Sequence, residues 1–135
     1  MNCIDFKLRH DFWISEFLCP HCGSVQVSEE LADRLQLLRS TCDAPVIIVS
    51  GYRCKEYNDS IPGADPNSFH IKGMAADIHI TGYEPEEIYY LADKLGFKGI
   101  GIYDTWVHVD VASYIHRWDD RVKNKGKEFI KKIVV

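Results

Sequence analysis

Residues 68–80 read SFHIKGMAADIHI, a turn followed by a stretch in which apolar and polar residues alternate. The alternation puts two isoleucines on one face of a strand and Asp77 on the other. His70 precedes Asp77 by seven residues, and Gly73 between them allows the chain to turn sharply. The stretch therefore predicts a strand with one buried and one polar face, entered from a turn that carries an imidazole.

The stretch TWVHVDV (105–111) has the same alternation, with His108 and Asp110 on one face and valines on the other. In an antiparallel sheet with one covered face, the polar residues of both strands meet on the open face. His70, Asp77 and His108 then form a three-residue ligand set for zinc, with the fourth position left to water as in catalytic sites. The alternative from the pattern alone is a group of unrelated surface side chains.

Other segments predict two helices and two further strands. Residues 28–39 and 85–96 carry apolar residues at helical spacing, after a capping serine and a leading proline respectively. PVIIVSG (45–51) is a β-branched run that ends at glycine, and GIGIY (99–103) is a short glycine-rich run, so both are expected to be strands. We predict a single α+β domain over residues 1–135, with helices packed on one face of a mostly antiparallel sheet and the zinc site on the opposite face.

Composition and charge exclude several classes of protein. The 135 residues are 46% apolar and 27% charged, which is ordinary for one globular domain. A net charge of −4 gives no electrostatic footprint for nucleic acid, and no apolar run is long enough to cross a bilayer. The N-terminus lacks the apolar core of a signal peptide, so we expect cytoplasmic synthesis without one. We expect a monomer with no nucleic-acid or membrane partner.

The five cysteines form a second pattern. CPHC (19–22) has the spacing of half a zinc ribbon, but no second C-x-x-C follows it. Cys54 follows a predicted strand, and we expect it near both cysteines of this motif, with Cys3 and Cys42 apart. Free thiols, one disulfide and a second metal site remain open for the three neighbours.

Three ordered motifs resemble the zinc D-alanyl-D-alanine carboxypeptidase superfamily. They are SGYRCKEYN (50–58), SFHIKGMAAD (68–77) and GIGIYDTWVHVDV (99–111). That superfamily includes phage L-alanyl-D-glutamate endopeptidases and D,D-dipeptidases, and the hedgehog signalling domain shares its fold. The resemblance covers residues 12–111 and implies zinc ligands at His70, Asp77 and His108.

The resemblance also implies a reaction. Arg53 corresponds to the family arginine that stabilises a developing oxyanion or holds a substrate carboxylate, and the fixed guanidinium fork suits either task. Ser68 is expected to hydrogen-bond substrate or only to shape the turn. The implied function is zinc-dependent hydrolysis of an amide bond in peptidoglycan stem peptides, by a D,D-carboxypeptidase or an L-alanyl-D-glutamate-type endopeptidase. The expected place of action is the cell wall, after release or as part of a phage particle.

The general base departs from the family pattern. Several branches carry a carboxylate three residues before the last ligand, where this chain has Thr105. Strand alternation favours Asp110 as an outer-shell or catalytic carboxylate, and Asp104 at the entry of the strand is the second candidate. The missing base leaves two alternatives to the enzyme: a zinc-containing binding module for cell wall or peptide with little or no catalysis, and a structural-zinc protein built on CPHC.

Overall fold

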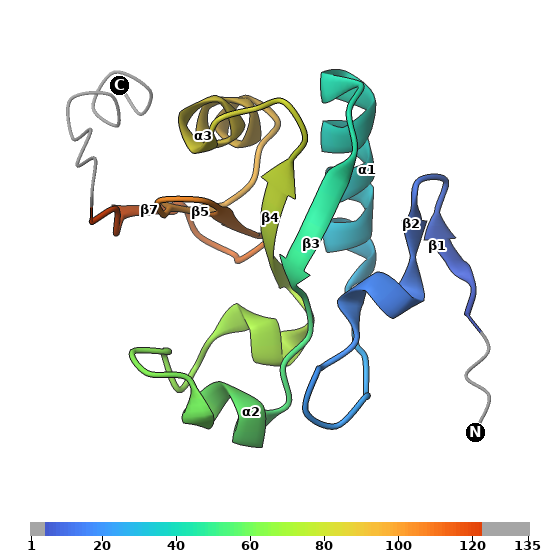
Figure 1. Cartoon of the computed structure of the whole chain (residues 1–135), viewed down its shortest axis with the longest axis vertical. Helices are drawn as coiled ribbons and strands as arrows, with labels where there is room; N and C mark the ends of the chain where they lie inside the picture. Colours follow the sequence, from blue (N-terminus) through green and yellow to red (C-terminus); the bar gives the residue numbers. More distant parts are fainter. Residues whose placement is uncertain (1–4, 123–135) are drawn as a thin grey trace.

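The computed structural model describes residues 5–122, in which short strands and helices alternate along the chain (Figure 1). The strands are β1 (Lys7–Arg9), β2 (Phe12–Trp13), β3 (Val46–Ser50), β4 (Ala75–Ile80), β5 (Gly99–Ile102), β6 (Val107–Asp110) and β7 (His116–Asp119). The α-helices are α1 (Glu29–Cys42), α2 (Lys55–Ser60) and α3 (Pro85–Lys94), and two short 3₁₀ helices are η1 (Ile14–Phe17) and η2 (Phe69–Lys72). No helix within the described residues is both long and apolar enough to span a bilayer.

The larger sheet has the strand order β3-β4-β6-β5-β7. Its neighbouring strands run antiparallel, except that β7 runs parallel to β5. The predicted α+β fold with a mostly antiparallel sheet is therefore confirmed. The parallel β7, the small β1–β2 sheet and helix α2 are elements that the sequence did not predict.

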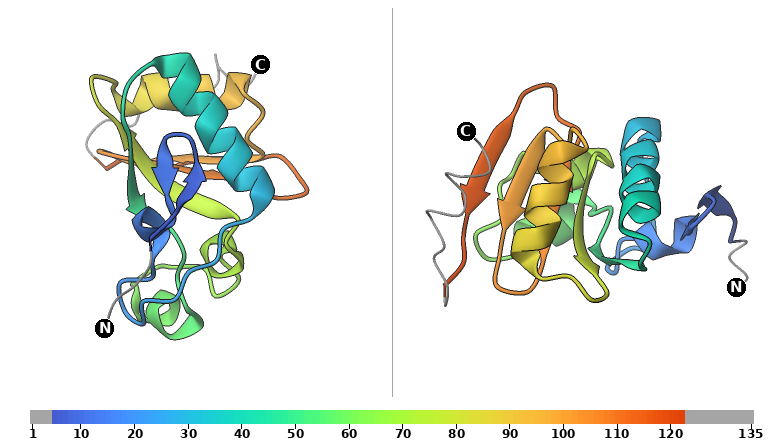
Figure 2. Two further views of the ribbon diagram at one scale, coloured as in Figure 1. Left: turned by 90° about the vertical axis from the view of Figure 1, so that its right-hand side faces the viewer. Right: turned by 90° about the horizontal axis from the view of Figure 1, so that it is seen from above.

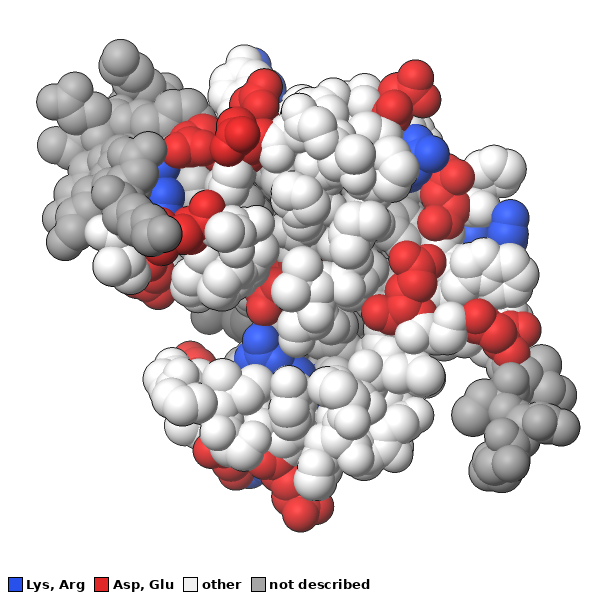
Figure 3. Space-filling view, viewed as in Figure 1, with Lys and Arg blue, Asp and Glu red and all other residues white. Residues whose placement is uncertain are grey.

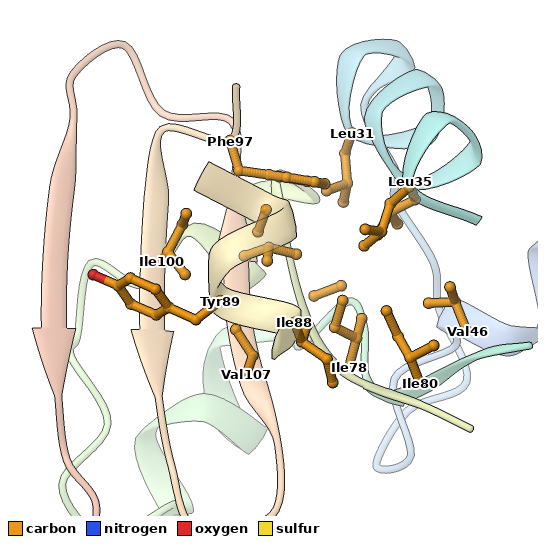
Figure 4. Close-up of a cluster of buried hydrophobic side chains, with 14 of the residues drawn as sticks. Leu31, Leu35, Val46, Ile78, Ile80, Ile88, Tyr89, Phe97, Ile100 and Val107 are labelled. Atoms are coloured by element: carbon orange, nitrogen blue, oxygen red, sulfur yellow. The ribbon is translucent and has the colours of Figure 1, made fainter. Parts of the chain in front are cut away.

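Helices α1 and α3 lie on one face of this sheet, as predicted, and α2 lies beyond the other (Figure 2). Between the two helices and the sheet is the hydrophobic core (Figure 4). Its buried side chains include Leu31, Leu35, Val46, Ile78, Ile80, Ile88, Tyr89, Phe97, Ile100 and Val107. The isoleucines and valines of β4 and β6 thus face the helices, which directs their polar neighbours to the opposite face.

The ends of the predicted elements shift for local reasons. Helix α1 is capped by Ser28, whose Oγ accepts a hydrogen bond from the backbone N–H of Leu31 at 3.1 Å. Helix α3 ends before Gly96, which has a positive φ of 85° and cannot continue it. Strand β6 begins later than predicted because the backbone N–H of Tyr103 bonds to the carbonyl of Trp106, closing a turn between β5 and β6.

The register of the sheet aligns polar residues in two rows across neighbouring strands. In one row, Asp77 of β4 is opposite His108 of β6, followed by Gly101 and Trp118. In the next row the order is Ala75, Asp110, Gly99 and His116. Residues at corresponding positions of adjacent strands share one face, so the rows bring distant parts of the sequence together.

Strand β5 has glycine in both rows, at Gly99 and Gly101. Side chains of neighbouring strands occupy the space that a β5 side chain would fill. A Cβ at Gly99 would overlap the carboxylate of Asp110, and a Cβ at Gly101 would overlap the indole of Trp118. The absence of side chains here lets Asp110 from β6 and Trp118 from β7 lie over β5.

We predict that Gly101→Ala lowers the free energy of unfolding by about 1–3 kcal/mol, because the new methyl group competes with Trp118 for space. Urea denaturation measures the loss. The Gly101→Ala, Trp118→Ala double variant should lose less than the sum of the single losses, since removing the indole relieves the overlap. Strictly additive losses would contradict this explanation.

Candidate active site

A cavity of about 710 Å³ opens on the face of the sheet that α1 and α3 leave uncovered. Its walls come from η2 and the loop before it, from β4, β6 and β7, and from the segment that links β3 to α2. The surface is hollowed between the sheet and the α2 segment, and basic atoms lie at this hollow (Figure 3). The lining contains the cations Arg53 and Lys72 and several carboxylates.

His70, Asp77 and His108 meet in this cavity, as the sequence predicts. One donor atom from each lies within 4.8 Å of the others. Asp77 Oδ1 is 3.2 Å from His70 Nε2 and 3.3 Å from His108 Nδ1. The pairing of β4 with β6 positions Asp77 beside His108, and the turn of η2 at Gly73 brings His70 to them.

Each histidine has its other ring nitrogen bonded away from Asp77. His70 Nδ1 donates to the carbonyl of Gly51 at 2.8 Å, which fixes its tautomer because a carbonyl only accepts. His108 Nε2 contacts Asp110 Oδ2 at 2.7 Å. Metal-binding histidines commonly donate their outer N–H to a carbonyl or carboxylate in this way. The two inner nitrogens and the Asp77 carboxylate therefore fit a zinc ion in both donor type and orientation.

The buried charges of this site are balanced by one another. Burial alone would raise the pKa of the Asp77 carboxyl, but the adjoining imidazoles of His108 and His70 outweigh burial and hold the pKa well below its usual value. Burial likewise opposes ionisation of Asp110, and its contact with His108 lowers the pKa of this carboxyl. Both carboxylates are thus ionised at neutral pH, the form that can bind a cation or accept an imidazole N–H.

Arg53 lies at the same site with its guanidinium held by three side chains. Nε donates to Ser50 Oγ at 3.2 Å, and one terminal nitrogen donates to Asn58 Oδ1 at 3.1 Å. The other terminal nitrogen donates to Asp77 Oδ2 at 3.1 Å. The guanidinium is consequently fixed in orientation beside the candidate metal ligands, where it lines the cavity.

Ser68 and the two candidate carboxylates take different positions. Ser68 lines the cavity, and its Oγ accepts the backbone N–H of His70 at 3.2 Å, so it shapes the turn. Asp110 also lines the cavity and is fully buried. Asp104 lies in the exposed turn between β5 and β6, outside the cavity lining, where its carboxylate accepts the backbone N–H of Val122 at 3.2 Å.

The sequence analysis missed the contribution of β7. His116 Nε2 lies 3.0 Å from Asp110 Oδ2, the same carboxylate oxygen that His108 Nε2 contacts, so one carboxylate joins two imidazoles. Trp118 and Tyr114 line the cavity beside it. The alternation of His116 and Trp118 was the available sign of a strand. The segment before it is irregular and the strand is short, so the sequence did not show which strand it pairs with.

A second cluster contains Cys19, Cys22 and Cys54, whose sulfur atoms lie within 4.8 Å of one another. Their predicted proximity is confirmed, and the four cysteines of the described residues are all free thiols. Cys42 is separate, in the hydrophobic core, as predicted. The prediction for Cys3 lies outside the described residues.

Comparison with known proteins places the site in a family. The family model Peptidase M15 matches residues 11–110, a span that contains all three candidate metal ligands. The peptidoglycan L,D-endopeptidase MepK of Escherichia coli (strain K12) is 35% identical over 89 residues, which is 62% of this chain and 48% of MepK. The probable peptidoglycan L,D-endopeptidase MepK of Haemophilus influenzae is 34% identical over 74 residues, 50% of this chain and 40% of that protein. The chain spans about half the length of the curated relatives it matches. The match over most of its residues shows that the chain belongs to the Peptidase M15 family.

Proposed function

We propose that this chain is a zinc-dependent peptidase that hydrolyses an amide bond in the stem peptides of peptidoglycan. The observation that carries the proposal is the convergence of His70, Asp77 and His108 in an open cavity, within a chain of the Peptidase M15 family. The named activity of the MepK relatives favours an endopeptidase over a carboxypeptidase. The proposed place of action is the cell wall, where such peptides occur.

His70, Asp77 and His108 are the proposed metal ligands, and Gly51 and Asp110 orient the two rings through their outer nitrogens. Zinc held by three protein groups supplies a Lewis acid that polarises a carbonyl and lowers the pKa of a water. The fixed tautomer of His70 favours this assignment, because its free nitrogen already faces the Asp77 carboxylate.

Arg53 is proposed to stabilise the negative charge that develops on the carbonyl oxygen, or to hold a substrate carboxylate. Its contacts with Ser50, Asn58 and Asp77 fix the guanidinium before substrate arrives, so little rotational freedom is lost in the reaction. Ser68 lines the same cavity and is proposed as a substrate-binding group.

Proton transfer is assigned to the Asp110–His116 pair. Both oxygens of Asp110 accept hydrogen bonds, and the residue is fully buried, so we propose it as a carboxylate that orients His108 and His116. The His116 side chain is 27% exposed and lines the cavity, which makes its imidazole accessible to substrate. His116 is therefore the proposed base that takes a proton from water and returns it to the leaving amine.

The second candidate function is a zinc-containing module that binds cell wall or peptide without cleaving it. The observation in its favour is Thr105, an exposed hydroxyl residue at the position where family branches carry a base. Asp104, the second candidate base, lies outside the cavity lining, so this proposal does not use it. The two functions differ in whether new amino groups appear in treated peptidoglycan.

Digestion of purified peptidoglycan tests the proposed function directly. Zinc-loaded protein should release peptide fragments whose masses identify the bond that is cleaved. The His70→Ala, His108→Ala double variant should release none, since it loses two of three proposed ligands. Binding of the wild-type protein to peptidoglycan without release of amines would instead support the binding module.

The roles of the carboxylates and of His116 are tested by three variants with zinc content measured in each. His116→Gln should retain zinc and lose roughly 10²–10⁴-fold in kcat, the usual contribution of a general base. Asp110→Asn should weaken zinc affinity by roughly 10–100-fold, because the Asp110 carboxylate contacts the outer ring nitrogen of His108, a proposed ligand. Asp104→Asn is the control and should remain close to wild type. An inactive Asp104→Asn beside an active His116→Gln would reverse the assignment.

Arg53→Lys keeps the positive charge and removes the fork that contacts Ser50, Asn58 and Asp77. We expect kcat to fall by roughly 10²–10³-fold, as on loss of one oxyanion donor, with the zinc content unchanged. Steady-state kinetics on a soluble stem peptide measures the effect. A rise in KM with unchanged kcat would assign Arg53 to substrate binding alone.

A further inference from the structure

Three cysteines from two distant parts of the sequence meet beside the segment that carries Arg53. Cys19 and Cys22 lie in the loop after η1, and Cys54 immediately precedes α2, where the two stretches of chain run close together (Figure 1; Figure 2, left). Their sulfur atoms lie within 4.8 Å of one another. The proposed hydrolysis uses none of these sulfurs, so the cluster requires a separate explanation.

Backbone donors point at the sulfurs of this cluster. The N–H of Cys54 donates to Cys19 Sγ at 3.4 Å, and the N–H of Tyr57 donates to Cys54 Sγ at 3.4 Å. Such donors favour the thiolate, which is the form of cysteine that binds metal.

The loop that presents the first two sulfurs is itself a closed turn. The N–H of Gly23 bonds to the carbonyl of Cys19 at 2.9 Å, and the N–H of Cys19 bonds to the carbonyl of Ser24 at 2.8 Å. Gly23 has a positive φ of 74°, a conformation that glycine adopts without strain. The C-P-H-C spacing is therefore held in a fixed loop, with both sulfurs within 4.8 Å of Cys54 Sγ.

Core packing does not account for the cluster. Cys19 is buried, but Cys22 is exposed and Cys54 is only half-buried, whereas a packing cysteine is usually enclosed. Cys42 provides the contrast, because it is buried in the hydrophobic core and its Sγ lies near the carbonyls of Arg39 and Ala44. A disulfide would use two of the three sulfurs and leave the third without a role.

We propose that Cys19, Cys22 and Cys54 form a second metal site that holds zinc through three thiolates and leaves the remaining position to solvent beside the exposed Cys22. Thiolate ligands select soft or borderline metal ions. Zinc is such an ion, and it binds without any change of oxidation state. The site is distinct in ligand chemistry from the His70–Asp77–His108 group, which offers nitrogen and oxygen only.

The second site would join the N-terminal segment to the backbone that supports the active-site cavity. The N–H of Tyr52 bonds to the carbonyl of Phe17 at 2.9 Å, and a Cβ at Gly51 would lie 2.7 Å from Phe17 Cα, so the two stretches already pack tightly. Gly51 holds the His70 ring through its carbonyl, and Arg53 follows two residues later. A metal at Cys54 therefore fixes the segment from which both contacts come. This structural role rests on the proposed function, whereas metal binding by the cysteines does not.

Elemental analysis of zinc in protein purified under reducing conditions without chelator tests the site. The wild type should hold about two zinc ions per chain, one at each ligand set. The Cys19→Ser, Cys22→Ser variant and the His70→Ala, His108→Ala variant should each hold about one. Cys42→Ser is the matched control and should hold as much zinc as the wild type. Full zinc content in the Cys19→Ser, Cys22→Ser variant would overturn the proposal.

Cobalt substitution separates failure of this site from failure of the proposed function, and it also serves if the cysteine variant does not fold. Co²⁺ bound to thiolates gives a sulfur-to-cobalt charge-transfer absorption that nitrogen and oxygen ligands do not give. We expect this absorption in the wild type and in the His70→Ala, His108→Ala variant. Its absence from the wild type, with three thiols that react freely with a thiol reagent or a disulfide detected by intact mass, would refute the second site.

Discussion

The ionised carboxylate of Asp77 is the group on which the arrangement of the cavity depends. A buried charge is costly unless it is paired and hydrogen-bonded. Arg53 donates to one oxygen of Asp77, and the other oxygen faces the inner nitrogens of His70 and His108, where the proposed zinc ion would pair with it. These partners come from η2, β6 and the segment after β3, so one side chain joins three separate parts of the chain. Loss of Arg53 would remove the positive side chain that is paired with this buried charge, which costs more than the contact itself contributes.

The strand alternation that reveals these residues also explains why much of the fold is readable from the sequence. Apolar residues in β4 and β6 must face α1 and α3, so their polar neighbours face away from the helices, where Asp77, His108 and Asp110 line the cavity. The same argument fails for Asp104, because a backbone turn between β5 and β6 interrupts the alternation there. Periodicity is informative only where the strand is regular.

The sequence pattern could not predict the position of residues that reach the site through pairing of distant strands. His116 joins the site because β7 runs parallel to β5, and nothing local in that short strand specifies its partner. The meeting of Cys19 and Cys22 with Cys54 was predicted from a motif and a strand end, but the contacts of Phe17 that dock the two segments were not. A fold gives no activity by itself, so the assignment of function depends on these side chains.

The two glycines of β5 have a consequence for how such a site can diversify. Since β5 contributes only backbone where Asp110 and Trp118 cross it, the cavity wall on that side is built from β7, the outermost described strand of the sheet. An edge strand has one neighbour, and exchanging its cavity-facing residues disturbs fewer packing contacts than exchanging those of a central strand. Selectivity for different peptides can thus evolve at the margin of the sheet, while the residues that hold the buried charge remain unchanged at its centre.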